Sequence, residues 1–470
     1  MVLVAACQSG TAAGLSRSNT AQSSWHGRCT GDGMSSQIPA AERAASSSRA
    51  QLGAAAWSMA NQVVDLLVHM TTAILVARWL GVQALGTFAF AFAAAGLLSV
   101  FMQFGSGPIC IQLYGEGKLS AGTVLASNLR FVLWGSLVAT VLLLPVPALF
   151  GLDWQAGMAL ALAHTALIAN GFAGCLLNLL LARDASRLDA GPMLLSRVLL
   201  LGSVVLAVLS GSLLWTVGSY LLAALVLTLG RAALVIRHGW APGLRHDPQV
   251  TRLIWRRARH LGVARMLGEL GTRSDLLLLQ WLSTTSAVAY FAACRRVLAG
   301  AQFAAAAACQ SLFPALARGP LQGTPRSIRA LYAGLPVVGS AVLLVVAGLG
   351  AGELTELLYG VAFAPAADTM RWLLLAAALQ VPATFLAQNL VLRGAERVAP
   401  RAQAVGTLLN LALNVIAIPR WGAQGAAAAT ALSELARLGI YLGASLFGPA
   451  NDRVTTAASP AGKVHQCSTT

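Results

Sequence analysis

Charged residues are scarce in this chain. They make up 10% of its 470 residues, whereas soluble domains carry about 25%. The mean hydropathy is +0.70 and 57% of the residues are hydrophobic, which excludes a soluble multidomain enzyme and a disordered chain. The apolar runs also lack the two-residue alternation of a β-barrel. What remains is a polytopic α-helical membrane protein.

Motifs that carry catalysis or bind cofactors are also missing. The chain has no GxxxxGK[ST] loop for nucleotide phosphates and no HExxH or Cys/His cluster for a metal. Its seven cysteines are scattered without a CxxC pair, so no redox role or structural disulfide follows. We therefore expect no cofactor, no metal, no catalytic residue and no enzymatic activity.

Twelve apolar segments follow one another along the chain. A membrane span needs about 20 residues, and backbone amides in lipid must be bonded locally, so each segment is predicted to be a helix. The segments cover roughly 53–78, 87–110, 122–148, 156–181, 191–210, 212–236, 259–282, 287–314, 328–350, 369–392, 400–418 and 422–447.

Basic residues sort to one side of these twelve segments. The net charge of +16 would suggest nucleic acid in a soluble protein, but here the positive-inside rule explains it, and no nucleic-acid partner is expected. With both termini in the cytoplasm, only Arg78, Arg371 and Arg420 lie at outer ends. The inner connections hold Lys118, Arg183, Arg187, Arg231, Arg237, Arg245, Arg252, Arg256, Arg257, Arg259, Arg318, Arg326, Arg329, Arg393, Arg397 and Arg401.

The longest inner connection divides the chain into two halves of six spans. Because six is even, both halves enter the membrane the same way round, which predicts two six-helix lobes related by a pseudo-twofold axis. The predicted parts are a disordered cytoplasmic segment (1–50), an N-lobe (51–236), a basic cytoplasmic linker (237–258), a C-lobe (259–448) and a disordered cytoplasmic tail (449–470).

Several ionisable side chains lie inside the apolar segments. Each costs about 2.5–3.5 kcal/mol on insertion scales, so such groups default to function or pairing. Asp65 shares a helical face with Asn61 and His69, and Glu434 lies three residues before Arg437. The other members of this group are Arg130, Arg197, Arg265, Glu269, Arg273, Asp275, Arg295 and Arg296.

These residues allow structural and functional interpretations. Arg130 and Arg197 are close enough to the inner surface to snorkel, and Arg265 with Glu269 fits a structural ion pair. Asn410 and Asn414 fit interhelical hydrogen bonding. In contrast, Arg273, Arg295 and Arg296 place three cations at one depth with too few acids nearby, which implies water or an anionic ligand. The outer segment 351–368 is predicted to be an interfacial loop, with Tyr359 and Phe363 at the headgroup level.

Three stretches carry a family pattern: LNLALNVIAIPRWGAQGAAAATALSE (409–434), ILVARWLGVQALGTFAFA (74–91) and TRSDLLLLQWLSTTSAVAYFAACRRV (272–297). They resemble the polysaccharide flippases of the multidrug/oligosaccharidyl-lipid/polysaccharide exporter superfamily. The resemblance implies a V-shaped bundle with a central cavity. It also implies movement of a polyprenyl-diphosphate-linked oligosaccharide across the bacterial inner membrane, for O-antigen, capsule or exopolysaccharide synthesis.

The residues and the resemblance together give a predicted site. The predicted substrate-binding residues are Arg78, Arg130, Arg197, Arg265, Arg273, Arg295, Arg296, Asn410 and Asn414. The predicted ion- or proton-coupling residues are Asp65, Glu269, Asp275 and Glu434. Expected partners are the lipid-linked oligosaccharide, membrane lipids, and a polysaccharide polymerase and glycosyltransferases of the same pathway.

Two other functions remain open. A cation-coupled multidrug exporter of the same superfamily would favour an acidic, apolar cavity, whereas this chain offers arginines. A membrane polysaccharide polymerase or ligase would need a large outer loop with catalytic acids, and the longest outer segment here is 351–368.

Overall fold

A computed structural model describes residues 60–241, 243–317, 326–395 and 397–447. Within these ranges the helices are joined by short connections and there is no strand. The predicted N-terminal segment 1–50 and tail 449–470 lie outside them. The described chain divides into two compact units. The first unit comprises 60–72 and 94–272, and the second comprises 73–93 and 273–447.

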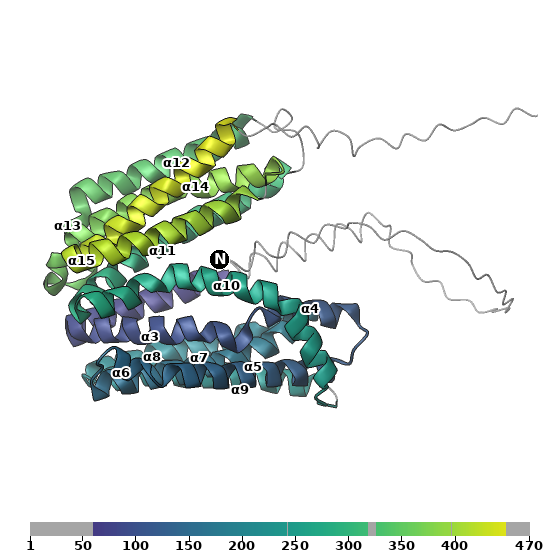
Figure 1. Cartoon of the computed structure of the whole chain (residues 1–470). Helices are drawn as coiled ribbons and strands as arrows, with labels where there is room; N and C mark the ends of the chain where they lie inside the picture. Colours follow the sequence, from purple (N-terminus) through teal and green to yellow (C-terminus); the bar gives the residue numbers. More distant parts are fainter. Residues whose placement is uncertain (1–59, 242, 318–325, 396, 448–470) are drawn as a thin grey trace, which may run out of the picture. The chain divides into compact units, whose positions relative to one another are not determined.

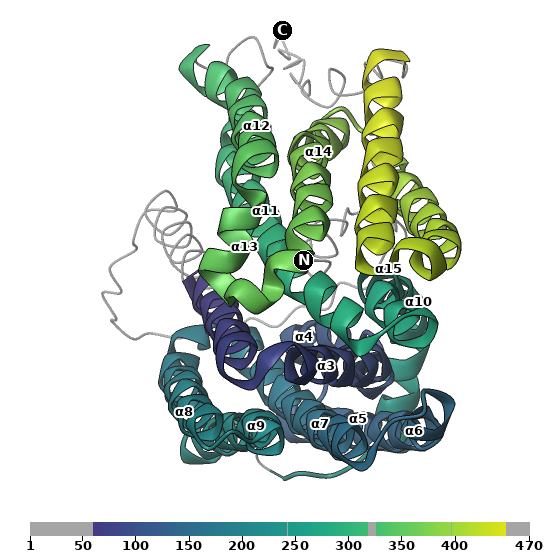
Figure 2. The same ribbon diagram turned by 90° about the vertical axis from the view of Figure 1, so that its left-hand side faces the viewer.

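The first unit is a bundle of helices that run side by side (Figures 1 and 2). α7 packs along α9, α8 packs on α9, and α4 and α5 pack on α7. Four divided or whole elements open and close this unit: residues 60–72 of the helix 60–75, residues 94–103 of α3 (Gly81–Gln103), α4 (Ser106–Glu116) and residues 248–272 of α10 (Pro248–Leu282). Between α4 and α10 lie α5 (Ala121–Leu143), α6 (Val146–Leu149), α7 (Trp154–Ala182), α8 (Ala190–Leu209) and α9 (Leu213–Arg237).

The second unit is built around α14. α15, α11 and α12 all pack on this helix. Its elements are the π-helical turn Val76–Leu80, the start of α3, the end of α10, α11 (Thr285–Ala317), α12 (Arg326–Val345), a second π-helical turn (Val346–Gly350), α13 (Ala351–Tyr359), a 3₁₀ segment (Val361–Ala366), α14 (Ala367–Leu392) and α15 (Val398–Phe447).

Eight helical stretches of the described residues are long and apolar enough to cross a membrane. Two of them have 57 and 50 residues, and at about 1.5 Å per residue each is far longer than the roughly 30 Å of a bilayer core. Gly81, with a φ of 86°, breaks the first, and Gly422, with a φ of 54°, breaks the second. Each stretch is therefore long enough for two crossings. The structure confirms the predicted all-helical, polytopic membrane protein.

Small residues let the helices of the second unit approach closely. A Cβ atom on Gly425 would lie 2.4 Å from the carbonyl oxygen of Ala417, across the break in α15. Ala423, Ala426 and Ala427 beside it are buried. Such small residues are the usual means by which membrane helices pack, because apolar side chains gain little by leaving lipid for protein.

Two expectations about the connections need correction. The predicted linker 237–258 is already helical from Pro248, where α10 begins, because Val250, Ile254 and Ala258 recur at helical spacing and pack into the first unit's core. Segment 351–368 is helical rather than an open loop. Tyr359 and Phe363 are buried there, and Tyr359 donates a 2.9 Å hydrogen bond to the carbonyl of Ala293.

Candidate functional site

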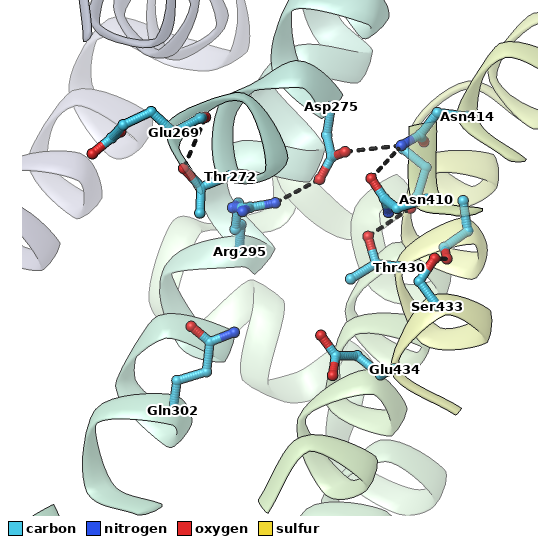
Figure 3. Close-up of polar contacts among 12 residues, drawn as sticks. Glu269, Thr272, Asp275, Arg295, Gln302, Asn410, Asn414, Thr430, Ser433 and Glu434 are labelled. Atoms are coloured by element: carbon cyan, nitrogen blue, oxygen red, sulfur yellow. Dashed lines mark hydrogen bonds and ion pairs between the residues drawn. The ribbon is translucent and has the colours of Figure 1, made fainter. Parts of the chain in front are cut away.

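A buried polar network centred on Asp275 lies in the second unit (Figure 3). Asp275, on α10, is 1% exposed. Its Oδ2 accepts a 2.6 Å hydrogen bond from Nη1 of Arg295 on α11, and its Oδ1 accepts a 2.8 Å bond from Nδ2 of Asn414 on α15. The same Asn414 nitrogen lies 3.0 Å from Oδ1 of Asn410. The network therefore ties three helices together through one carboxylate.

Both oxygens of Asp275 are occupied by protein donors, and the Arg295 charge is matched by an acid. Of the four residues, Arg295 is the most accessible, with 25% of its side chain exposed and its guanidinium 5.7 Å from the centre of the Phe291 ring. No group of three or more His, Cys, Asp or Glu side chains in the described ranges could hold a metal.

The neighbouring arginines of the second unit have different partners. Arg273 donates to the carbonyl of Phe92 over 3.2 Å. Arg296 donates to the carbonyl of Ala292, one turn back on its own helix, over 3.1 Å. No acid of the described chain makes an ion pair with Arg296, so this half-buried guanidinium keeps an unmatched charge.

Arg78 caps the C-terminal end of α13. Its guanidinium donates to the backbone carbonyls of Leu357 and Leu358, the former at short range and the latter over 3.0 Å. These carbonyls belong to the last turn of α13, where a cation is favoured by the unpaired acceptors and the helix dipole. The residue predicted to bind substrate thus has a capping role in this structure.

Glu434 is paired with an arginine of its own helix. Nε of Arg437 lies 3.1 Å from Oε2 of Glu434, and Nη2 contacts the other oxygen at short range. Nη1 of Arg437 lies 2.5 Å from Oε1 of Gln403. The acid predicted to couple ions is therefore neutralised on both oxygens, as the three-residue spacing on one face suggested.

A second polar cluster lies in the first unit. Oδ1 of Asp65 contacts Nη2 of Arg197 on α8 at short range and lies 3.6 Å from Nε2 of His69, one turn further along the helix 60–75. Nδ1 of His69 lies 3.2 Å from the hydroxyl of Tyr220 on α9, and the two rings stack. Arg197 is thus held by an acid rather than left to snorkel alone.

The remaining predicted residues are not gathered into either cluster. Arg130, on α5, is exposed, and Arg265 and Glu269 are half-buried on α10. Neither Arg130 nor Arg265 makes a hydrogen bond or ion pair with another described residue. The hydroxyl of Thr272 donates to the backbone carbonyl of Glu269 over 3.0 Å (Figure 3).

One buried ion pair was missed by the sequence analysis. Nε and Nη2 of Arg231 each lie 2.7 Å from an oxygen of Asp189, and Nη1 donates to the carbonyl of Ala173 over 3.1 Å. Arg231 is 7% exposed and lies within α9, so it belongs to this helix rather than to the connection that follows it. Its place inside the predicted span 212–236 was the signal, because an arginine there needs a partner.

Comparisons with known proteins bear on the fold and the family. A model of the polysaccharide biosynthesis protein family matches residues 53–319, more than half of the chain. The fold is similar to lipid II flippase MurJ in an inward closed conformation, with a TM-score of 0.69, 12% identity, and 82% of this chain and 86% of that chain covered.

A multidrug resistance MATE family transporter of the MOP superfamily, in an inward-facing conformation, is also similar. Its TM-score is 0.58, with 17% identity, and 80% of this chain and 92% of that chain are covered. No curated protein sequence matches significantly. The resemblance seen in the sequence is confirmed: the chain belongs to the polysaccharide biosynthesis protein family and has the fold of these MOP-type membrane proteins.

Proposed function

We propose that this multi-pass membrane protein is a flippase. Its cargo would be a polyprenyl-diphosphate-linked oligosaccharide, moved from the cytoplasmic to the outer leaflet of the bacterial inner membrane for O-antigen, capsule or exopolysaccharide synthesis. The family supports a role in polysaccharide biosynthesis, and the fold is that of proteins which include a lipid II flippase. Both termini would face the cytoplasm, with polymerase and glycosyltransferases of the pathway as neighbours.

The observation that carries this proposal is the unmatched charge of Arg296. It lies eleven residues into α11, about 16 Å along that helix, and no described acid neutralises it. A cation at that depth is costly without an anion or water beside it. A diphosphate supplies such an anion, and a planar guanidinium binds phosphate oxygens in a bidentate manner.

The other predicted residues enter the proposal with differing support. Arg295 precedes Arg296 on α11, and Arg273 lies on α10 of the same unit. Asp65 and Glu269 are half-buried, whereas Asp275 and Glu434 are buried, so we propose the first two acids as the ones that exchange ions. We propose that substrate binds while the site faces the cytoplasm and that the two lobes then rock to face outward.

A complementation experiment tests the proposal. In cells that lack the gene, Arg296→Ala at normal membrane levels should leave surface polysaccharide reduced and lipid-linked repeat units accumulated inside. One charge-assisted hydrogen bond is worth about 1.5–3 kcal/mol, so the loss of substrate affinity should be roughly 10–100-fold. Full surface polysaccharide in this variant would contradict the assignment.

Arg420→Ala is the matched control. Arg420 donates to the carbonyl of Ile416, one turn back on its own helix, over 3.0 Å, the same arrangement as Arg296 with Ala292. It is exposed at the predicted outer end of its span. We expect this variant to support normal surface polysaccharide, which would separate loss of a site charge from loss of any arginine.

A multidrug exporter is the second candidate, because a MATE family transporter shares the fold. Such a protein would take cationic drugs, which arginines in the site would repel. A drug-susceptibility panel on the same deletion cells distinguishes the two. Increased susceptibility to several cationic drugs with unchanged surface polysaccharide would favour the exporter.

A further inference from the structure

The start of α10 carries a row of arginines on one exposed face. Arg252, Arg256 and Arg259 recur at spacings of four and three residues, which places them on the same side of the helix. All three are exposed, and Trp255, on the same side, is 50% exposed. These four residues form a surface that we name the α10 basic face. The flippase proposal uses none of them.

The opposite side of this part of α10 is fixed to the first unit. Val250, Ile254 and Ala258 are buried against apolar residues of α4 and α5. The ring of Trp255 stacks on that of Phe104, with 5.4 Å between the ring centres. The helix is therefore held on one side by packing, and the α10 basic face is left open on the other.

This part of α10 lies at an end of the bundle where the chain leaves the membrane. α5 begins at Ala121 and α9 ends at Arg237, and both helices are long and apolar enough to span a bilayer. Nη1 of Arg257 lies 3.0 Å from Oε1 of Glu116, which ends α4 just before α5 begins (Figure 1). The α10 basic face is therefore placed near the headgroups of a bilayer rather than among its acyl chains.

The arginines of this face have few acceptors within the protein. Neither Arg252 nor Arg256 makes a hydrogen bond or an ion pair with another residue of the described ranges. Nε of Arg259 lies 3.3 Å from Nε2 of His260. Between residues 238 and 262 the sequence has one acid, Asp247. The guanidinium groups are therefore open to an anion from outside the protein.

Beyond the arginines, the same face of α10 becomes apolar. Val263, Met266 and Leu267 follow Arg259 at helical spacing and are 52%, 38% and 59% exposed. At about 1.5 Å per residue they lie roughly 6–12 Å further along the helix. Cations followed by exposed apolar side chains match a phospholipid, whose charged headgroup precedes its acyl chains. A soluble acidic protein would match the arginines but would leave the apolar residues uncovered.

We propose that the α10 basic face binds the headgroup of an anionic phospholipid, whose acyl chains lie along Val263, Met266 and Leu267. Guanidinium groups suit phosphate oxygens, tryptophan suits the boundary between headgroups and acyl chains, and arginine clusters beside a membrane helix attract anionic lipids. On the predicted topology this lipid belongs to the cytoplasmic leaflet. The lipid site does not depend on the flippase function, because it uses none of the residues assigned to the cargo.

Native mass spectrometry of the full-length protein measures this binding. Protein in detergent micelles is titrated with phosphatidylglycerol and, separately, with phosphatidylcholine that carries the same acyl chains. The wild-type protein should prefer the anionic lipid by about fivefold for each arginine that contacts the headgroup. The preference should shrink when ammonium acetate is raised from about 0.05 M to about 0.5 M, because salt screens exposed charges.

A double variant tests the assignment to this face. Arg252→Gln combined with Arg256→Gln removes two unmatched charges and should reduce the preference for phosphatidylglycerol by about 25-fold. Arg183→Gln combined with Arg187→Gln is the matched control. Both of these arginines are exposed between α7 and α8, so the control loses the same number of charges from the same unit. It should keep the wild-type preference.

Equal binding of the two lipids by the wild-type protein would overturn the lipid site. An unchanged preference in the Arg252→Gln and Arg256→Gln variant, or an equal loss in the control, would do the same.

Two further probes distinguish this lipid from other phosphate compounds. Glycerophosphoglycerol, the same headgroup without acyl chains, should bind far more weakly than the lipid; equally tight binding would indicate a phosphate site instead. Displacement of the lipid by farnesyl-diphospho-N-acetylglucosamine would assign the face to the cargo and overturn the inference. None of these results decides the flippase function, which the Arg296→Ala complementation tests separately.

Discussion

Four arginines within the apolar helices of this protein are paired with carboxylates. Arg197, Arg231, Arg295 and Arg437 each have a carboxylate within ion-pair distance. This pattern follows from the cost of an isolated charge in a low-dielectric medium. Arg296 has no such carboxylate among the described residues and is therefore an arginine that needs a ligand.

Removal of the Asp275 carboxylate should destabilise the protein strongly. Asp275→Ala leaves the Arg295 charge without its partner in a buried site, which typically costs about 3–5 kcal/mol. The exposed pair Asp368–Arg371, with an N–O distance of 2.7 Å, provides the control, because Asp368→Ala should cost about 0–1 kcal/mol. Denaturant unfolding in mixed micelles measures both.

A second variant shows whether the charge itself is responsible. Asp275→Ala combined with Arg295→Met removes both partners and should recover much of the lost stability. If Asp275→Ala and Asp368→Ala unfolded at the same midpoint, the structural importance of the Asp275 network would be refuted.

The residue types of the site could be predicted from the sequence, but not their pairing. Asp275 and Arg295 are twenty residues apart on different helices, and their contact depends on how α10 and α11 pack. The Glu434–Arg437 pair could be predicted, because two residues three positions apart on one helix lie on the same face. His69 was visible on the face of Asp65, but Tyr220 and Arg197 come from helices whose placement no local pattern indicates.

At the scale of elements, glycines set where the long apolar stretches break. Gly422 has a φ of 54° and a ψ of −127°, a combination open to glycine and costly for other residues. It lies three residues after Pro419, which weakens the preceding turn. The sequence placed this break correctly between 418 and 422, because proline and glycine mark it directly.

Gly422→Ala should therefore destabilise the second unit by about 1–3 kcal/mol. A Cβ there would also lie 3.3 Å from Oγ of Ser283, which is a tight contact, so the new methyl group would not offset the backbone strain by favourable packing. Gly439→Ala is the matched control on the same helix: it has open space around it, and alanine should stabilise a helix by about 0.5–1 kcal/mol. Opposite signs in thermal unfolding are the expected result; equal shifts would contradict the role of Gly422.

The outer segment shows why some element-scale expectations failed. An aromatic residue near a membrane boundary suits the headgroup region, and Tyr359 and Phe363 were assigned there. The structure buries both, since α13 and the 3₁₀ segment fold back onto α11 and α14. Whether a short segment lies on the lipid or on the protein depends on tertiary packing, which composition does not encode.

At the scale of the whole molecule, the distribution of arginines predicts how the chain crosses the membrane. Removing Arg231 from the inner set leaves the bias intact, because Arg237, Arg245, Arg252 and Arg256 follow it closely. The positive-inside rule then places the 238–247 connection in the cytoplasm and the turn between α6 and α7 outside.

Single-cysteine labelling checks this arrangement. Of the seven cysteines, Cys110, Cys175, Cys294 and Cys309 are buried, and all seven should be replaced by serine. Gln155→Cys, at the exposed start of α7, should then react with a membrane-impermeant maleimide in intact cells. Leu244→Cys, which is 61% exposed, should react only after the membrane is permeabilised.

The result constrains the chemistry as well as the topology. If Leu244→Cys reacted in intact cells, the chain would be inverted, and the arginines proposed to receive a cytoplasmic substrate would open first to the wrong leaflet. If both positions reacted only after permeabilisation, a span would be missing before α7. Labelling of Gln155→Cys alone in intact cells puts α8 and α9 in the orientation in which a headgroup from the cytoplasm can approach Arg197.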